Sequence, residues 1–225
     1  MSTTDGILHR VRSDKALSSG PSYHPRTSEY LSSGGLAALD WVQELQEAPG
    51  ATTVLSVGAM SSSGGDIDPD HMFLSMLRQD LIRDIHFIWN ADRREFHTII
   101  ALGLDVAGHP RITHGGFSAA VLDETTGGLV FEGKKDGSLG PGRAFTARLE
   151  VDYRKPMPVD TEIVCTARLL NTEGRKIWTE AELRDRPGGT LYAVAKALYV
   201  TVRAEAEPRG EERAAEDGAA EEGRA

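Results

Sequence analysis

The chain is short of cysteine, of basic residues and of long apolar runs. Cys165 is the one cysteine in 225 residues, so an intrachain disulfide framework is excluded and a reducing compartment is expected. No apolar run approaches the roughly 18–20 residues that span a bilayer, so no membrane span is expected. Lys and Arg number 25 against 34 Asp and Glu, a net charge of −9. This balance argues against a nucleic-acid partner, although a few local cations can still bind a small phosphorylated ligand.

The N-terminal region also lacks the compact apolar centre of a secretory signal. Residues 1–30 are rich in Ser and Arg, which resembles an organelle transit peptide, but Asp5, Asp14 and Glu29 argue against one. We therefore expect a cytoplasmic protein, with a mitochondrial location as the alternative.

What is present is the composition of a globular chain, with 40% hydrophobic and 26% charged residues. Such a chain can bury a sizeable core, and its length favours one domain with extensions. We predict a flexible lead over 1–34, a helical extension over 35–84, the main domain over 85–203 and a disordered acidic tail over 204–225.

Two helical patterns occupy the extension. Residues 36–48, LAALDWVQELQEA, have apolar positions at helical spacing and are followed by Pro49 and Gly50 as a stop. A second pattern runs from His71 to about Ile85. We expect both helices to pack on the main domain. The stretch ATTVLSVGAM between them has no clear period and stays unassigned.

The main domain changes to strand patterns around one buried helix. HFIWN and EFHTIIALGL predict two strands, and VAGHPRITHGG is too rich in Gly and Pro for regular structure. FSAAVLDETTGGLVF has little polar face, as in a helix buried on most sides. FTARLEVDY, TEIVCTARLL, KIWTEAELR and TLYAVAKALYVTV predict four more strands, and in the first the odd positions from Phe145 to Tyr153 are apolar. One helix wrapped by a strongly curved antiparallel sheet is the hotdog architecture, an α+β fold.

The segment HGGFSAAVLDETTGG, residues 114–128, carries the candidate chemistry. Asp123 lies in an otherwise small and apolar helix, where a carboxylate has either a structural partner or a task. Gly115 and Gly116 open that helix with unpaired N–H groups, which suit the oxyanion formed when a thioester carbonyl is attacked. Asp123 is about 12 Å of helical rise beyond Gly115, too far for one carbonyl to touch both. If both act on one substrate, they come from different subunits, with two helices antiparallel across a dimer.

At this point the sequence resembles a known family. HGG, the helix with LD, and TARLEVDYRKPMPVDTEIVCTARLLNTEGRKIWTEAEL resemble the PaaI-like hotdog thioesterases, over about residues 85–202. The branch that contains the animal thioesterase superfamily members acting on fatty acyl-CoA is the most similar. The resemblance implies an acyl-CoA substrate, a role in fatty acid metabolism, a homodimer or dimer of dimers, and no cofactor, since CoA is part of the substrate.

The resemblance also implies roles for particular residues. Asp123 would be the general base or nucleophile, the N–H of Gly115 or Gly116 the oxyanion donor, and His114 would shape the loop around that donor. Thr146 would help to position the attacking water, and its place on the polar face of the strand alternation agrees with this.

Two features of the sequence depart from the family pattern, and several Lys and Arg residues are candidates for binding substrate. Many relatives carry an Asn shortly before HGG, where this chain reads GHPRIT, so His109 either substitutes or the role is vacant. The loop EGKKDGSLGPGR, between the helix and the strand that begins near Thr146, is longer than usual and could alter substrate access. Candidates for binding the phosphates of CoA are Arg154, Lys155, Arg175, Lys176, Lys134, Lys135 and Arg143.

Other chemistries are less well supported. A serine hydrolase based on Ser118 or Ser138 lacks the G-x-S-x-G motif, and every histidine precedes both serines. Cys165 occupies an apolar strand position, and the spacing of His109 and His114 is not a recognised metal-ligand pattern, so no metal site is expected.

Two alternatives keep the fold. A hotdog dehydratase or hydratase would pair Asp123 with His114 or His109, and a non-catalytic acyl-CoA-binding protein would use the same surface without turnover.

Overall fold

The computed structural model describes residues 25–54 and 71–202. In chain order the elements are α2 (Pro25–Ser32), η1 (Gly35–Ala38), α3 (Asp40–Glu47), β1 (Ala51–Val54), α4 (Met72–Arg78), β2 (Ile82–Asn90), β3 (Glu95–Leu102), β4 (Ala107–His109), β5 (Ile112–Thr113), α5 (Gly115–Lys135), β6 (Ala144–Tyr153), β7 (Glu162–Glu173), β8 (Lys176–Arg184) and β9 (Leu191–Thr201).

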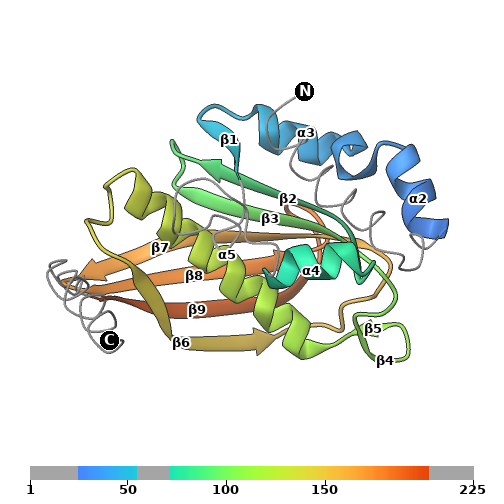
Figure 1. Ribbon diagram of the computed structural model, residues 1–225. Coiled ribbons are helices and arrows are strands. Elements are labelled where there is room, and N and C mark those ends of the chain that lie inside the picture. The colour runs from blue at the N-terminus through green and yellow to red at the C-terminus, as the bar shows by residue number, and fades with distance from the viewer. Residues whose placement is uncertain (1–24, 55–70, 203–225) are drawn as a thin grey trace, which may run out of the picture.

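Seven strands form one antiparallel sheet in the order β1-β2-β3-β7-β8-β9-β6. The sheet curves around the long helix α5, which lies across its concave face (Figure 1). The predicted α+β hotdog fold is therefore confirmed.

Helix α5 is held against the sheet by apolar and small residues. Val121 and Leu122 are fully buried in the main core. A Cβ atom on Gly128 would lie 2.4 Å from the ring of Phe96, so only glycine lets the helix approach β3 this closely. On the other side of α5, Phe117 meets Phe73 of α4 with ring centroids 6.3 Å apart. The helix is thus buried on most sides, as its composition predicted.

The N-terminal elements cover the opposite, convex face of the sheet, above β2 and β3 in Figure 1. Leu36 and Val42 pack there with Ile88 and Ile99. The next residue, Ile100, points to the opposite face of the sheet and belongs to the core under α5. Because both faces are covered, β2 is buried at every position. This explains why its sequence shows no polar alternation.

The second helical pattern was predicted too long. Helix α4 ends at Arg78, Asp80 turns the chain with a φ of 59°, and Ile85 lies inside β2 instead of at the end of a helix. A strand that is buried on both faces has apolar residues at many positions, and these also fit the spacing of a helical stripe. The predicted helix was therefore extended into β2. The first pattern is also interrupted, at Leu39, whose extended backbone separates η1 from α3.

Three further segments differ from the expectations. Pro25–Ser32 forms α2 although it belongs to the predicted flexible lead, and the unassigned ATTV is β1, which pairs with β2. The Gly- and Pro-rich segment before HGG holds the short β4–β5 pair. The predicted acidic tail and residues 1–24 lie outside the described residues. Within the residues described, no helix is long and apolar enough to cross a membrane.

Strand β6 contains a bulge that changes which side chains face α5. The register with β9 shifts between Thr146 and Arg148, so the inward-facing set switches by one position there. Leu149 and Val151 pack on the core, as predicted. Before the bulge, however, Thr146 points to the helix and Phe145 is 58% exposed. The unbroken alternation read from the sequence is therefore corrected: Thr146 lies on the same face as Leu149 and Val151 and not on the opposite one.

Candidate active site

Asp123 lies midway along α5 and is half-buried beside two hydroxyl groups from the sheet. Thr146 donates a hydrogen bond from Oγ1 to Asp123 Oδ1 over 3.0 Å. The Tyr199 hydroxyl lies 3.4 Å from the same oxygen and 3.1 Å from the Asp123 carbonyl oxygen. Thr146 and Tyr199 are directly opposite each other in the β6–β9 register, so one cross-strand pair supplies both donors. Asp123 therefore has specific partners and still reaches solvent.

The Tyr199 hydroxyl is buried between α5 and the sheet. Its oxygen is 2.9 Å from Thr126 Oγ1, which also donates to main-chain carbonyl groups of α5. Burial raises the pKa of Tyr199 well above its usual range. The group therefore stays protonated at physiological pH and acts toward Asp123 as a donor.

The start of α5 presents one free amide hydrogen. His114 is the N-cap, and its Nδ1 accepts the Gly116 N–H over 2.9 Å. The Phe117 N–H is bonded to the His114 carbonyl over 3.0 Å. Among residues 25–54 and 71–202, none accepts a hydrogen bond from the Gly115 N–H. Gly115 is thus the available donor of the two glycines, and His114 shapes the turn that presents it.

A tyrosine fixes this turn from the sheet. The Tyr153 hydroxyl, at the end of β6, donates to the Gly115 carbonyl oxygen over 2.8 Å. The β4–β5 pair supports the turn from the other side, where a Cβ atom on Gly108 would lie 2.9 Å from the Cα of His114. His109 belongs to the same pair and is exposed.

Asp123 and Gly115 are held at opposite ends of β6. Thr146, near the beginning of the strand, contacts Asp123, and Tyr153, its last residue, contacts Gly115. The structure therefore does not bring the carboxylate and the free amide together within one protomer.

The cations that follow β6 lie near the Gly115 end. The backbone N–H groups of Arg154 and Lys155 both donate to the Tyr192 carbonyl, over 2.7 and 3.2 Å. Both residues are exposed and come directly after the tyrosine that contacts Gly115. The Arg154 side chain pairs with Asp152 over 3.0 Å, a surface pair that a phosphate can displace at little cost.

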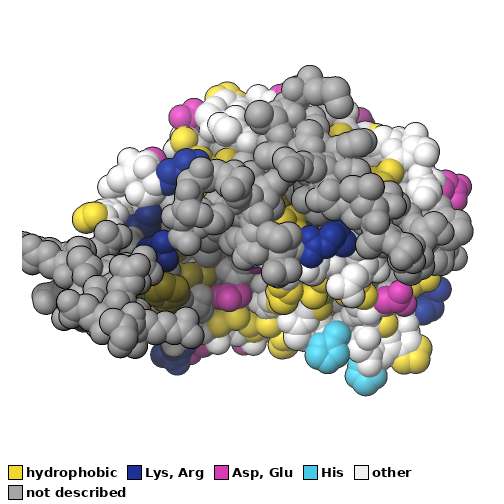
Figure 2. Space-filling model, in the orientation of Figure 1, with side chains coloured by type: hydrophobic (Ala, Val, Ile, Leu, Met, Phe, Trp, Pro, Cys, Tyr) yellow, Lys and Arg dark blue, Asp and Glu magenta, His cyan; other side chains and the backbone are white. Residues whose placement is uncertain are grey.

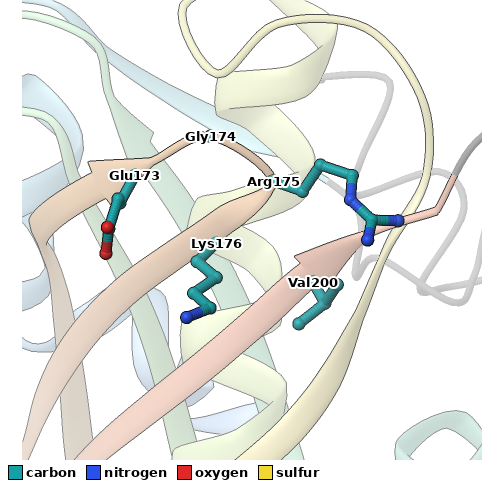
Figure 3. Close-up of a pocket in the computed structure, with 5 residues that line it drawn as sticks. All are labelled: Glu173, Gly174, Arg175, Lys176 and Val200. Atoms are coloured by element: carbon teal, nitrogen blue, oxygen red, sulfur yellow. The ribbon is translucent and has the colours of Figure 1, made fainter.

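The other predicted pair of cations lies elsewhere. Arg175 and Lys176 line a cavity of about 310 Å³ with Glu173, Gly174 and Val200. Figure 3 shows the Arg175 side chain extending over the end of β9, next to Val200. Val200 follows the inward-facing Tyr199, so it points to the face of the sheet away from α5. These two cations are therefore separated from Asp123 by the sheet within one protomer.

The loop cations have other partners. Lys134 donates to the Leu139 carbonyl and to Thr201 Oγ1, both over 2.8 Å, and so ties down the long loop after α5. Lys135 pairs with Glu132 over 3.2 Å. Arg143 is exposed at the end of that loop.

The nucleophiles that sequence reasoning set aside are poorly placed. Cys165 is buried under α5, and burial raises the pKa of its thiol to about 12, so little thiolate exists at neutral pH. Ser118 is also buried, and the ring nitrogen Nδ1 of nearby His114 is used by the helix cap.

Tyr199 and Tyr153 were missed as site residues. In the sequence each is an aromatic residue at a strand position, which predicts only packing. The pairing register of β6 and β9 identifies them, and that register cannot be read from the sequence.

Comparison with known proteins agrees with this fold. Residues 111–192 match the family model described as Thioesterase superfamily. The acyl-coenzyme A thioesterase THEM4 of Rattus norvegicus is 28% identical over 128 residues, which cover 57% of this chain and 52% of that protein. The mouse (Mus musculus) protein of the same name is 34% identical over 98 residues, 44% of this chain and 39% of its own length. The chain thus spans about half the length of the curated relatives it matches, or less.

Further similar proteins are more distant. An uncharacterized mitochondrial membrane protein of Saccharomyces cerevisiae, FMP10, is 26% identical over 111 residues, 49% of this chain and 44% of its own. A solved thioesterase superfamily protein is 23% identical, with 88% of each chain covered and a TM-score of 0.49. A Bacillus halodurans protein solved with CoA is 23% identical over 49% of this chain and 70% of its own, with a TM-score of 0.42. Over residues 111–192 the chain is therefore similar to the thioesterase superfamily.

Proposed function

We propose that this protein hydrolyses acyl-CoA thioesters to a free acid and CoA. Asp123 acts as general base or nucleophile and the Gly115 N–H donates to the oxyanion, each from a different subunit of a homodimer. The curated relatives named acyl-coenzyme A thioesterase support the substrate class. The single observation that carries the proposal is a half-buried carboxylate on the central helix that is held by hydroxyl groups and still open to solvent.

The contacts of Asp123 favour hydrolysis over hydration or dehydration. Its Oδ1 is bonded to Thr146 and Tyr199, and no histidine among the described residues contacts its carboxylate. A dehydratase that transfers protons through a His and carboxylate pair would need such a contact. No residue within 25–54 and 71–202 bonds to Oδ2, which leaves that oxygen to a water molecule or to the thioester carbon as far as the described part of the chain is concerned.

The free edge of the sheet supports a dimer. Within the described residues β6 pairs with β9 alone, and it exposes 58% of Phe145 and 56% of Tyr153. Figure 2 shows hydrophobic side chains along the lower edge of the molecule, where Figure 1 places β6. An open strand edge with apolar side chains is a template for pairing with a second copy.

Antiparallel pairing of two β6 strands would also complete the site. It places the beginning of one strand beside the end of the other. The end that holds Asp123 would then face the end that holds Gly115 in the partner subunit. A two-fold dimer of this kind has two identical sites, and each takes its base from one protomer and its oxyanion donor from the other.

The chemistry follows from these positions. Asp123 removes a proton from a water molecule whose oxygen attacks the thioester carbonyl, and the resulting oxyanion accepts the Gly115 N–H. The C–S bond then breaks, the acyl group leaves as the acid, and the CoA sulfur takes up a proton. In the covalent variant the carboxylate attacks the carbonyl carbon first, the C–S bond breaks and the CoA thiolate leaves with a proton from solvent. Water then cleaves the mixed anhydride to the free acid and the Asp123 carboxylate. Arg154 and Lys155 lie on the Gly115 side and would bind a CoA phosphate there.

The test is release of free CoA thiol from short, medium, long and aromatic acyl-CoAs. We expect turnover on at least one of them, and we expect Asp123→Asn to abolish it while the fold is kept. Asp92→Asn, which makes the same charge change in the exposed turn between β2 and β3, is the matched control. Normal turnover by Asp123→Asn contradicts the mechanism. Binding of acyl-CoA without thiol release favours the non-catalytic alternative.

Two further measurements concern assembly and location. Light scattering should give a dimer or a dimer of dimers, and a strictly monomeric active protein contradicts a shared site. Cell fractionation decides between the cytoplasmic expectation and the mitochondrial alternative, which the yeast relative's description supports.

A further inference from the structure

Tyr199 contacts Asp123 but has no part in the reaction steps proposed above. Its hydroxyl is placed within reach of both the side chain and the main chain of Asp123, at 3.4 and 3.1 Å. The side chain is 3% exposed and packs with Val130 and Ile177. A buried hydroxyl in an apolar cluster is costly unless it is bonded, so its partners fix its position closely.

We propose that Tyr199 is a positioning residue for the proposed hydrolysis: with Thr146 it holds Oδ1 of Asp123, so that Oδ2 faces the thioester. The inference rests on the proposed function and names a determinant of it. Two donors on one oxygen fix the rotation of a carboxylate, which a single donor leaves free. Thr146 comes from an edge strand and is exposed, whereas Tyr199 comes from the interior of the sheet, so Tyr199 is the more rigid of the two.

The backbone around Asp123 fits this role. The bulge after Thr146 turns that residue inward, directly opposite Tyr199. On the helix, a Cβ atom on Gly127 would lie 3.4 Å from the Tyr199 hydroxyl, the limit of ordinary contact, so a small residue keeps this space open. Burial raises the pKa of Tyr199 so far that the hydroxyl keeps its proton over the whole range of an assay.

The other ionisable group next to Asp123 faces away from this pair. Glu124 approaches His71, the residue that precedes α4 in the chain, with 3.7 Å between Glu124 Oε2 and His71 Nε2. The described groups that bond the Asp123 carboxylate are therefore neutral hydroxyls from β6 and β9.

The test compares Tyr199→Phe with Tyr192→Phe, which removes a buried hydroxyl from the same strand without touching Asp123. For Tyr199→Phe we expect kcat to fall about tenfold with KM nearly unchanged, in keeping with the loss of one hydrogen bond to a charged group. A loss of stability with kcat unchanged, or equal behaviour of the two variants, overturns the proposal.

Two additions keep the test decisive. Thr146→Val and Tyr199→Phe should be non-additive in a double-mutant cycle, because both donors hold the same oxygen; additive effects count against the proposal. Crystal structures of the wild-type protein and of Tyr199→Phe need no substrate. A rotated or disordered Asp123 carboxylate in Tyr199→Phe supports the positioning role even if the wild-type protein releases no thiol, and an unchanged orientation refutes it.

If Tyr199→Phe does not fold, 3-fluorotyrosine at position 199 keeps the shape of the side chain and makes its hydroxyl a stronger donor. Because the hydroxyl is kept, kcat should stay close to the wild-type value. A fall as large as the tenfold expected for the lost hydroxyl overturns the proposal.

Discussion

Replacing Gly115 by proline removes one amide hydrogen from the start of α5 with little other change. Gly115 is the first residue of the helix, a position that proline favours because no intrahelical bond is lost. His114 has φ −63° and ψ 133°, the extended backbone that a residue before proline prefers. A Cβ atom at position 115 would lie 3.5 Å from the Tyr153 ring, an ordinary contact. The variant therefore tests the N–H group separately from the fold.

The expected loss is that of one oxyanion donor. Removing such a donor lowers kcat by roughly 10²–10³, or about 3–4 kcal/mol in the activation free energy. Gly115→Ala is the matched control, since it adds the same Cβ atom but keeps the N–H group. Thiol release should fall by that factor in Gly115→Pro and by far less in Gly115→Ala. Equal activities of the two variants would refute the role of this amide.

Mixing variants tests whether the site is shared. A hybrid of one Asp123→Asn protomer and one Gly115→Pro protomer has one site with both defects and one site with neither. After unfolding and random reassociation of equal amounts, about a quarter of wild-type activity should return, because half of the dimers are hybrids with one intact site. If each protomer carried a complete site, no activity would return. That result would exclude a site shared between two subunits.

Three other outcomes follow from the core. Gly128→Ala should lower the free energy of unfolding by about 1–3 kcal/mol, because its Cβ atom would overlap the Phe96 ring. Gly127→Ala, the control, should not destabilise the protein. Chemical denaturation measures the free energy of unfolding of both variants. Burial lowers the pKa of His97 to about 4, so the unfolded chain binds the extra proton between about pH 6.5 and 4 and stability falls as the pH falls through that range. His97→Asn should reduce this loss, which amounts to about 3 kcal/mol at most; an identical pH dependence in both proteins would exclude the contribution. Cys165→Ala should keep full thiol release, and an inactive but folded variant would restore the cysteine as a candidate nucleophile.

Much of the fold and the centre of the site could be predicted from local sequence. The change from helical to alternating patterns located the strands, and a small, apolar segment predicted the buried helix. Asp123 stood out because a carboxylate in such a helix needs a partner or a task. The two glycines stood out because the first amide groups of a helix are unpaired. Each of these inferences depends on residues within a few positions of one another.

The partners of Asp123 depended on pairing between distant strands. Thr146 was suggested only by the family resemblance. Its position on the same face as Leu149 and Val151 was not foreseen, because a bulge of one residue reverses the alternation and leaves no clear sign in FTARLEVDY. Tyr199 could not be found at all, since its distance from Asp123 depends on the β6–β9 register and on how closely glycine lets α5 approach the sheet.

The sequence by itself thus predicted the central helix and the longer strands of the main domain, and it singled out the acid and the bare amide groups as candidates, because propensity and periodicity act locally along the chain. The tertiary structure decided which hydroxyl groups meet the acid, that Arg175 and Lys176 lie on the far face, and that Asp123 and Gly115 are held apart at the two ends of β6. The physical reason is that strand register, the inward or outward direction of a side chain and the distance from helix to sheet are set by packing between segments far apart in the sequence.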